Sequence, residues 1–231
     1  MADVIVALDL ADAESALRLV NQLGESCRFY KVGSELFTAE GPAIVEALRD
    51  QGCHVFLDLK LHDIPNTVAR AIRRVDEMGV RITTVHASGG RAMMEAAVEA
   101  AGVSCGVFAV TVLTSLDDSA LAEVNGNNAG TVSESVLRLA ALSSSCGVRG
   151  VVCSGHEASV LRNRFGSTIE LLVPGIRLTG DDAGDQSRVV TPSAAIAAGA
   201  DYIVIGRSIT AAADPLAAME AVLEEISTKP K

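Results

Sequence analysis

The stretch HVFLDLKLHDIPNTVARAIRRVDEMGVRITTV, residues 54–85, holds a strand, a helix and a second strand in succession. Its two ends, His54–Leu59 and Ile82–Val85, are short and largely apolar runs, which is typical of strands buried on both faces of a parallel sheet. The segment between them, Thr67–Met78, has the length of a helix. The stretch therefore predicts a strand–helix–strand unit with parallel strands.

The same alternation continues along the rest of the chain. The other predicted strands are Val4–Leu8, Phe29–Val32, Gly106–Val112, Gly150–Cys153, Ile169–Val173 and Tyr202–Ile205, and the other predicted helices are Asp12–Leu23, Ala43–Gln51, Arg91–Ala101, Thr131–Ser143, His156–Phe165, Pro192–Ala198 and Pro215–Ile226. Eight such units in 231 residues predict an α/β fold, a single (β/α)8 TIM barrel domain over residues 1–231. A doubly wound open sheet is the alternative, but its first turn is usually rich in glycine, and here that turn reads Asp9-Leu10-Ala11-Asp12.

Composition excludes several classes of protein. The chain has 29 acidic and 19 basic residues, a formal net charge of −10, so we expect no nucleic-acid partner, which would require a clustered basic face. The longest uncharged run, Ala100–Leu116, is too short and too polar to span a membrane. A strand from Val4 leaves no room for a signal peptide, and the five cysteines include no C-x-x-C pair. We therefore expect a cytoplasmic protein without disulfides or a metal site.

Charged residues lie at the predicted strand ends, where TIM barrels carry their active sites. Asp58 and Lys60 are two positions apart on one strand, so their side chains project to the same face. Lys31 ends the neighbouring strand, and Asp63 follows in the next loop. The sequence thus predicts a Lys31–Asp58–Lys60–Asp63 array of alternating charge at the barrel mouth. The alternative is a structural set of salt bridges, with Asp63 capping a helix that begins near Pro65.

Two arginines follow the last two predicted strands. Arg177 ends the seventh, and Arg207 follows Gly206 at the start of a helix after the eighth. Arginine side chains and helix amide groups both bind phosphate, so we expect an anion site here; rim salt bridges are the alternative. The intervening segment Leu178–Arg188 is longer than an ordinary loop of this kind, and we expect it to act as an active-site lid.

The run Phe56-Leu57-Asp58-Leu59-Lys60-Leu61-His62-Asp63-Ile64-Pro65-Asn66-Thr67 resembles the signature of the orotidine 5′-phosphate decarboxylase family. The resemblance extends through Ala7-Leu8-Asp9, Tyr30-Lys31-Val32-Gly33, Val85-His86-Ala87-Ser88-Gly89-Gly90, Val110-Thr111-Val112-Leu113-Thr114-Ser115, Val173-Pro174-Gly175-Ile176-Arg177, Asp185-Gln186 and Ile205-Gly206-Arg207-Ser208. These motifs keep the family's order along the chain, and the ends fit the short, unfused form of the family.

The resemblance implies decarboxylation of orotidine 5′-phosphate to UMP, the last step of de novo pyrimidine nucleotide synthesis, with no metal and no organic cofactor. Loss of CO2 leaves an electron pair in the plane of the ring, which requires a fixed positive charge and a proton donor close by. The resemblance makes Lys60 that donor, with Asp58, Lys31 and Asp63 as the other catalytic residues.

The resemblance also implies the binding residues and the assembly. The substrate-binding set is Asp9, Lys31, Asp58, Leu59, Lys60, Leu61, His62, Asp63, Ile64, Pro65, Asn66, Thr67, Thr114, Pro174, Arg177, Gln186, Gly206 and Arg207. Asp63 and Thr67 are expected to reach the site of the neighbouring subunit in a homodimer. Gln186 is expected to bridge phosphate and base when a mobile loop near 178–188 closes.

Two other functions stay open. A sugar-phosphate decarboxylase or aldolase of the same barrel group would use Mg²⁺ and an extra acidic ligand at the end of the second strand. Here that strand ends in Lys31-Val32-Gly33-Ser34, and Glu35 is the nearest acid. A non-catalytic phosphate-binding barrel is the second alternative, although such a protein is expected to have lost part of the charged array.

Overall fold

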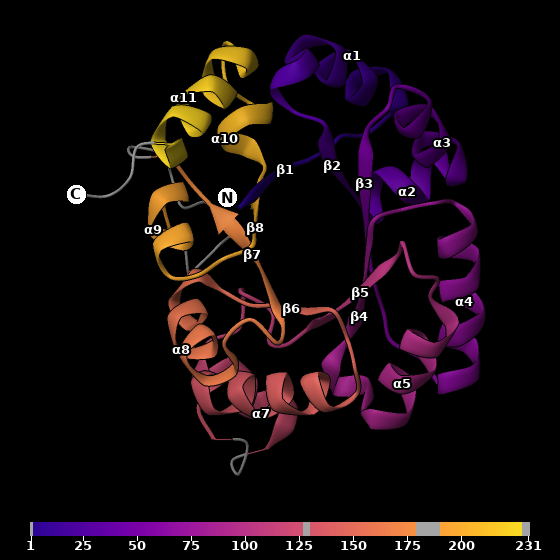
Figure 1. Cartoon of the computed structure of the whole chain (residues 1–231), viewed down its shortest axis with the longest axis vertical. Helices are drawn as coiled ribbons and strands as arrows, with labels where there is room; N and C mark the ends of the chain where they lie inside the picture. The colour runs from indigo at the N-terminus through magenta and orange to yellow at the C-terminus, as the bar shows by residue number, and fades with distance from the viewer. Residues whose placement is uncertain (1, 127–129, 179–189, 228–231) are drawn as a thin grey trace.

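The computed structural model describes residues 2–126, 130–178 and 190–227 (Figure 1). Eight strands close into a barrel in chain order, and every neighbouring pair is parallel, including β1 with β8. The strands are β1 (Asp3–Ala7), β2 (Phe29–Gly33), β3 (His54–Leu61), β4 (Ile82–His86), β5 (Gly106–Val110), β6 (Gly150–Val152), β7 (Glu170–Ile176) and β8 (Tyr202–Ile205). The predicted TIM barrel is confirmed, and the open sheet is excluded.

Helices surround the barrel on its outer side (Figure 1). They are α1 (Ala13–Leu23), α2 (Ser34–Glu40), α3 (Pro42–Asp50), α4 (Pro65–Glu77), α5 (Arg91–Ala100), α6 (Asp118–Asn125), α7 (Val132–Ser145), α8 (Gly155–Phe165), α9 (Pro192–Ala197), α10 (Arg207–Thr210) and α11 (Pro215–Ser227), with short 3-10 turns at Gly24–Ser26 and Ala87–Gly89. None of the helices in this described part of the chain combines the length and hydropathy that a membrane span requires.

Two of these helices, α2 and α6, are additions to the predicted pattern, and α10 is the short helix expected after Gly206. Gly41 has φ +61° and Pro42 follows it, so one continuous helix across this segment is impossible and the chain forms two separate short helices, α2 and α3. Asp117 starts α6, because its side chain accepts a hydrogen bond from the amide of Ala120. Strand β5 ends at Val110, two residues before its predicted end.

Residue alternation along the strands builds two apolar layers. Every second strand residue points into the barrel, and the buried apolar ones form a cluster of Ile5, Ala7, Phe29, Phe56, Ile82, Phe108, Val110, Val152, Leu172, Tyr202 and Val204. Rings in this cluster pack edge to face, with the Phe108 and Tyr202 centroids 5.7 Å apart at 83°. The other strand residues, such as Val6 and Leu57, pack against the helices. Apolar side chains therefore fill the interior of the barrel, and the inward-facing positions nearer the carboxyl ends of the strands form its mouth.

Candidate active site

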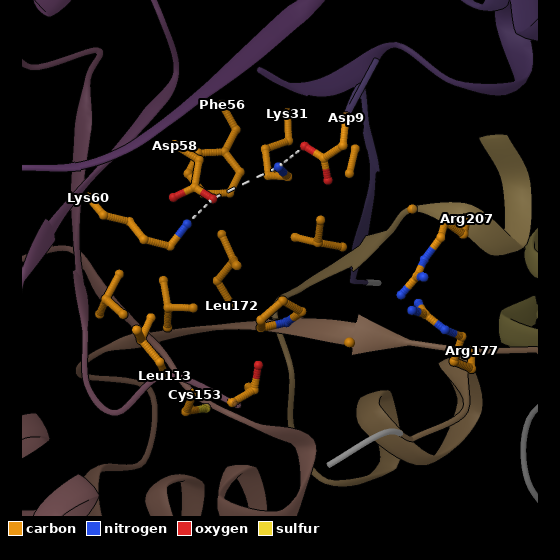
Figure 2. Close-up of a pocket in the computed structure, with 18 of the residues that line it drawn as sticks. Asp9, Lys31, Phe56, Asp58, Lys60, Leu113, Cys153, Leu172, Arg177 and Arg207 are labelled. Carbon is orange, nitrogen blue, oxygen red and sulfur yellow. Dashed lines mark hydrogen bonds and ion pairs between the residues drawn. The ribbon is translucent and has the colours of Figure 1, made fainter. Parts of the chain in front are cut away.

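A cavity of about 430 Å³ opens at the carboxyl ends of the strands. Its walls continue the inward-facing register of the strands, so β2 contributes Lys31, β3 contributes Asp58 and Lys60, and β7 contributes Pro174. Because the same alternation of strand residues continues from the apolar interior to the strand ends, the polar side chains lie directly above that interior. The cavity is lined on one side by acidic and lysine side chains and on another by two arginines (Figure 2).

Four charged side chains alternate in sign along one wall of the cavity. Asp58 Oδ2 accepts a hydrogen bond from Lys60 Nζ at 2.6 Å and lies 4.0 Å from Lys31 Nζ. Lys31 Nζ also donates to Asp9 Oδ1 at 2.7 Å. Figure 2 shows these contacts as one continuous chain of interactions. Asp58 and Lys31 are largely buried, whereas the Lys60 side chain is 38% exposed, so Lys60 is the cation in this chain that is most accessible from solvent.

An irregularity in β3 sets the position of Lys60. Leu57 pairs with Thr83 and Leu61 with Val85, so three residues of β3 stand opposite one residue of β4. Lys60 takes φ +50°, and it is the one non-glycine residue with positive φ in the described chain. That conformation costs a lysine roughly 1–2 kcal/mol. Bulges of this kind re-aim side chains and are frequent beside active sites.

The two arginines lie on the wall formed by β7 and β8. Arg177 follows β7 and is buried, and its guanidinium donates to the Ile176 carbonyl at 3.0 Å. Arg207 begins α10 directly after Gly206. Figure 2 shows the two guanidinium groups turned towards each other. Two like charges brought together beside a cavity favour an anion between them, and the fork of each guanidinium suits phosphate oxygens.

An apolar wall joins the two charged regions. Among its side chains are Phe56, Val112, Val152, Leu172 and Val204. Sequence reasoning did not assign these residues to the site, although the two-residue period of each strand could have found most of them. An apolar lining lowers the local dielectric constant, so the charges on either side of it act more strongly on a bound ligand.

Apart from Lys60, the predicted residues at the end of β3, in the loop after it and at the start of α4 lie outside the lining of this cavity. The residues Leu59, Leu61, His62, Asp63, Ile64, Pro65, Asn66 and Thr67 belong to the predicted binding set, but they do not line the cavity of the single chain. Asp63 is exposed, and its Oδ1 accepts a hydrogen bond from the Ile64 amide at 2.6 Å. The array of the single chain therefore contains Asp9 where the sequence predicted Asp63.

The other predicted residues divide between those at the cavity and one outside the described chain. Asp9, Thr114, Pro174, Arg177, Gly206 and Arg207 line the cavity together with Lys31, Asp58 and Lys60. Gln186 and nearly all of the predicted 178–188 loop lie outside the described residues. Within the described ranges, no three His, Cys, Asp or Glu side chains form a group that could hold a metal ion.

A pair of histidines lies beside the mouth. The His62 and His86 rings have centroids 5.4 Å apart. Burial, followed by the nearby His62 and Lys60, lowers the pKa of His86 below its usual 6.5. His86 is therefore predominantly neutral at pH 7 and adds little positive charge next to Lys60.

Fold and site together define a TIM-barrel protein whose mouth is built to bind a small anionic molecule between a lysine–aspartate array and an arginine pair. Comparison with known families agrees with this class. The chain belongs to the Orotidine 5'-phosphate decarboxylase / HUMPS family, whose family model matches residues 2–222. The resemblance that the motifs indicated is thereby confirmed.

Individual relatives match over nearly their whole length. A protein named orotidine 5'-phosphate decarboxylase from Chromobacterium violaceum is 55% identical over 228 residues, which is 97% of this chain and 91% of the relative. One of the same name from Halorhodospira halophila is 50% identical and covers 97% of this chain and 95% of its own. The crystal structure of orotidine 5'-phosphate decarboxylase from Lactobacillus acidophilus has a TM-score of 0.86 at 37% identity, covering 99% of this chain and 100% of its own.

Proposed function

We propose that this protein, acting in the cytoplasm as a single domain, decarboxylates orotidine 5′-phosphate to UMP in the last step of de novo pyrimidine nucleotide synthesis. The observation that carries the proposal is the family match over residues 2–222. The cavity supports it independently, because it offers a cation pair for a phosphate at one end and a lysine held by an aspartate at the other.

The reaction breaks one carbon–carbon bond. The bond between the pyrimidine ring and its carboxylate cleaves, CO2 leaves, and the electron pair stays on the ring carbon. Lys60 Nζ stabilises that charge and then transfers a proton to the same carbon to give UMP. Water returns the proton to Lys60 at the cavity mouth, and the partial exposure of its side chain supports this step.

The remaining cavity residues hold the substrate and the array. Asp58 stands beside the reacting carboxylate and keeps Lys60 directed at the ring, and Lys31 and Asp9 bind the ribose hydroxyls. Arg177 and Arg207 bind the phosphate, a role supported by their convergence on one side of the cavity (Figure 2). Fixing the substrate at both ends supplies the orientation on which much of the rate depends.

The test is the ultraviolet absorbance of orotidine 5′-phosphate mixed with purified protein in EDTA. We expect the orotidylate band to disappear with the wild type, and Lys60→Ala to lower kcat by at least about 1,000-fold, because it removes both a charge and a proton donor. Arg18→Ala is the control: Arg18 is an exposed residue of α1 paired with Glu14. If the wild type leaves the band unchanged, the proposal fails, and sugar phosphates with Mg²⁺ are the next substrates to test.

We propose further that the protein is a homodimer in which Asp63 and Thr67 reach the neighbouring site. Two features support this arrangement. Asp63 is exposed at the rim without joining the cavity of its own chain, and the adjacent Ile64 is an apolar residue that is 68% exposed. An exposed apolar side chain beside an exposed acid fits a rim covered by a second subunit.

Mixing two inactive variants tests the shared site. In a hybrid of Lys60→Ala and Asp63→Ala subunits, the site of the Asp63→Ala subunit keeps its own Lys60 and gains an intact Asp63 from the partner. Random exchange should restore about one quarter of the wild-type sites, because half of the dimers are hybrids and each has one intact site. No recovery, with exchange verified by two differently sized tags, would contradict the assignment.

A further inference from the structure

Thr84 occupies a special place opposite the bulge of β3. Three residues of β3 lie between the pairs Leu57–Thr83 and Leu61–Val85, and Thr84 is the residue of β4 that stands between those same pairs. One side chain of β4 thus faces both ends of the bulge. Thr84 is fully buried and does not line the cavity.

Its hydroxyl bonds to both ends of the bulge at once. The Lys60 amide donates to Thr84 Oγ1 at 3.0 Å, and Thr84 Oγ1 lies 2.8 Å from Asp58 Oδ1. A backbone N–H can only donate, so the hydroxyl accepts from Lys60 and directs its own proton to the Asp58 carboxylate. The bond to Lys60 lies in the backbone, at the residue with positive φ.

This contact divides the two oxygens of Asp58 between different partners. Oδ1 accepts from Thr84, while Oδ2 accepts from Lys60 Nζ at 2.6 Å and faces Lys31 Nζ at 4.0 Å. The carboxylate is therefore fixed in rotation about its own axis. Lys60 is held at its backbone by Thr84 and at its ammonium group by Asp58, which closes a ring of hydrogen bonds through three residues.

We propose that Thr84 is a positioning residue of the decarboxylation, which sets the orientation of Asp58 and the backbone of Lys60 through one hydroxyl group. The inference rests on the proposed function, because Thr84 acts through residues assigned to that reaction. Without the hydroxyl, Asp58 is free to turn, and Lys60 loses the amide contact at its strained backbone. Displacements of about 1 Å in a catalytic group lower rates by up to about 100-fold.

The neighbouring threonine provides a matched control. Thr83 is equally buried on the same strand, but its Oγ1 donates to the Leu57 carbonyl at 3.1 Å on the outer side of the barrel. Thr83→Val and Thr84→Val each replace one buried hydroxyl by a methyl group of similar shape. A merely structural role predicts similar losses of thermal stability and equal, small changes in kcat for the two variants.

The experiment measures kcat, KM and the thermal midpoint for four variants beside the wild type. We expect Thr84→Val to lower kcat about 10- to 100-fold with KM within about twofold, since the interaction acts on the reacting groups and not on phosphate binding. Thr83→Val should keep kcat within about twofold. Thr84→Ser and Thr84→Ala differ only by a hydroxyl, so this pair isolates the hydroxyl even if Thr84→Val does not fold.

The outcomes separate the inference from the proposed function. Thr84→Ser is expected to keep kcat within about threefold of the wild type, and Thr84→Ala to lose at least tenfold. If the wild type is active and the Thr84→Ser and Thr84→Ala variants have equal kcat, the inference fails while the proposed function stands. If the wild type does not decarboxylate orotidine 5′-phosphate, the function itself fails.

Discussion

Lys60 shows how a single residue combines strain with chemistry. Its backbone has φ +50°, its amide donates to Thr84, and its ammonium group donates to Asp58. The contacts at both ends offset the cost of the conformation, which is roughly 1–2 kcal/mol for a residue other than glycine. A lysine here is thus directed by its main chain as well as by its charge.

Gly33 is the position where an added methyl group should affect activity more than stability. A Cβ atom here would lie 2.9 Å from both Asp9 Oδ1 and Lys31 Nζ. Its φ of −93° is open to any residue, so Gly33→Ala should fold, and the movable ends of the two side chains should give way. We expect kcat/KM to fall about tenfold or more, with little change in the thermal midpoint.

Gly24→Ala is the converse variant. Gly24 has φ +51° with nothing within 4 Å of an added Cβ, so alanine here strains the backbone and touches no site residue. It should lower the free energy of unfolding by about 1 kcal/mol and leave kcat/KM unchanged. If Gly33→Ala instead lost stability while its kcat/KM stayed at the wild-type value, the role given to the Lys31–Asp9 contact would be wrong.

At the scale of elements, the two-residue period of β3 was enough to predict that Asp58 and Lys60 project together. The same period did not reveal the bulge between them, because a bulge depends on how β3 pairs with β4, and Thr84 lies 24 residues beyond Lys60. The short helix α2 was also missed, since it lacks a side-chain cap and fills a stretch read as a connection. Local sequence patterns predict the direction in which side chains project from a strand, whereas the register of strand pairing and the bulges in it depend on tertiary packing.

The start of α8 provides a prediction at this scale. Ser154 is fully buried behind the cavity residue Cys153, its side chain accepts from the His156 amide, and Glu157 accepts from the Ser154 amide. Ser154→Ala should lower the free energy of unfolding by about 1–2 kcal/mol, measured by urea denaturation.

The capping box of α7 is the comparison. Thr131 and Glu134 make the same reciprocal bonds at an exposed helix start. Thr131→Ala should lower the free energy of unfolding by less, about 0.5–1 kcal/mol, because water replaces the lost hydrogen-bond partner. Equal losses in the two variants would mean that burial does not strengthen the Ser154 cap.

At the scale of the whole molecule, the cysteine thiols are all buried in the fold. All five cysteines lie in the described residues, where they are buried and form no disulfide. Burial raises the pKa of Cys27 and raises that of Cys105 to about 11, so little thiolate forms near neutral pH. We expect Ellman's reagent at pH 7.5 to react with fewer than about one thiol per native chain within minutes, and with all five in guanidinium. Rapid reaction of several thiols in the native protein would contradict this arrangement.

The barrel as a whole was predictable because eight repeats of one pattern leave few other topologies. The arginines after β7 and β8 could also be assigned to the mouth, since all strand ends of a parallel barrel meet on one side. The position of the Asp63 side chain outside the cavity of its own chain could not be predicted in this way. Asp63 lies in a loop, and the two-residue period of a strand does not describe the direction of loop side chains.

The closure of the barrel has one more consequence. Strand β1 pairs with β8, so the first and last strands meet along a seam. Asp9 follows β1, and Lys31, Asp58 and Lys60 belong to β2 and β3, whereas Arg177 and Arg207 follow the last two strands. A molecule held by both groups fastens the beginning of the chain to its end across that seam. Ligand binding therefore opposes the opening of the ring, and it stabilises the fold where the chain alone has no covalent link.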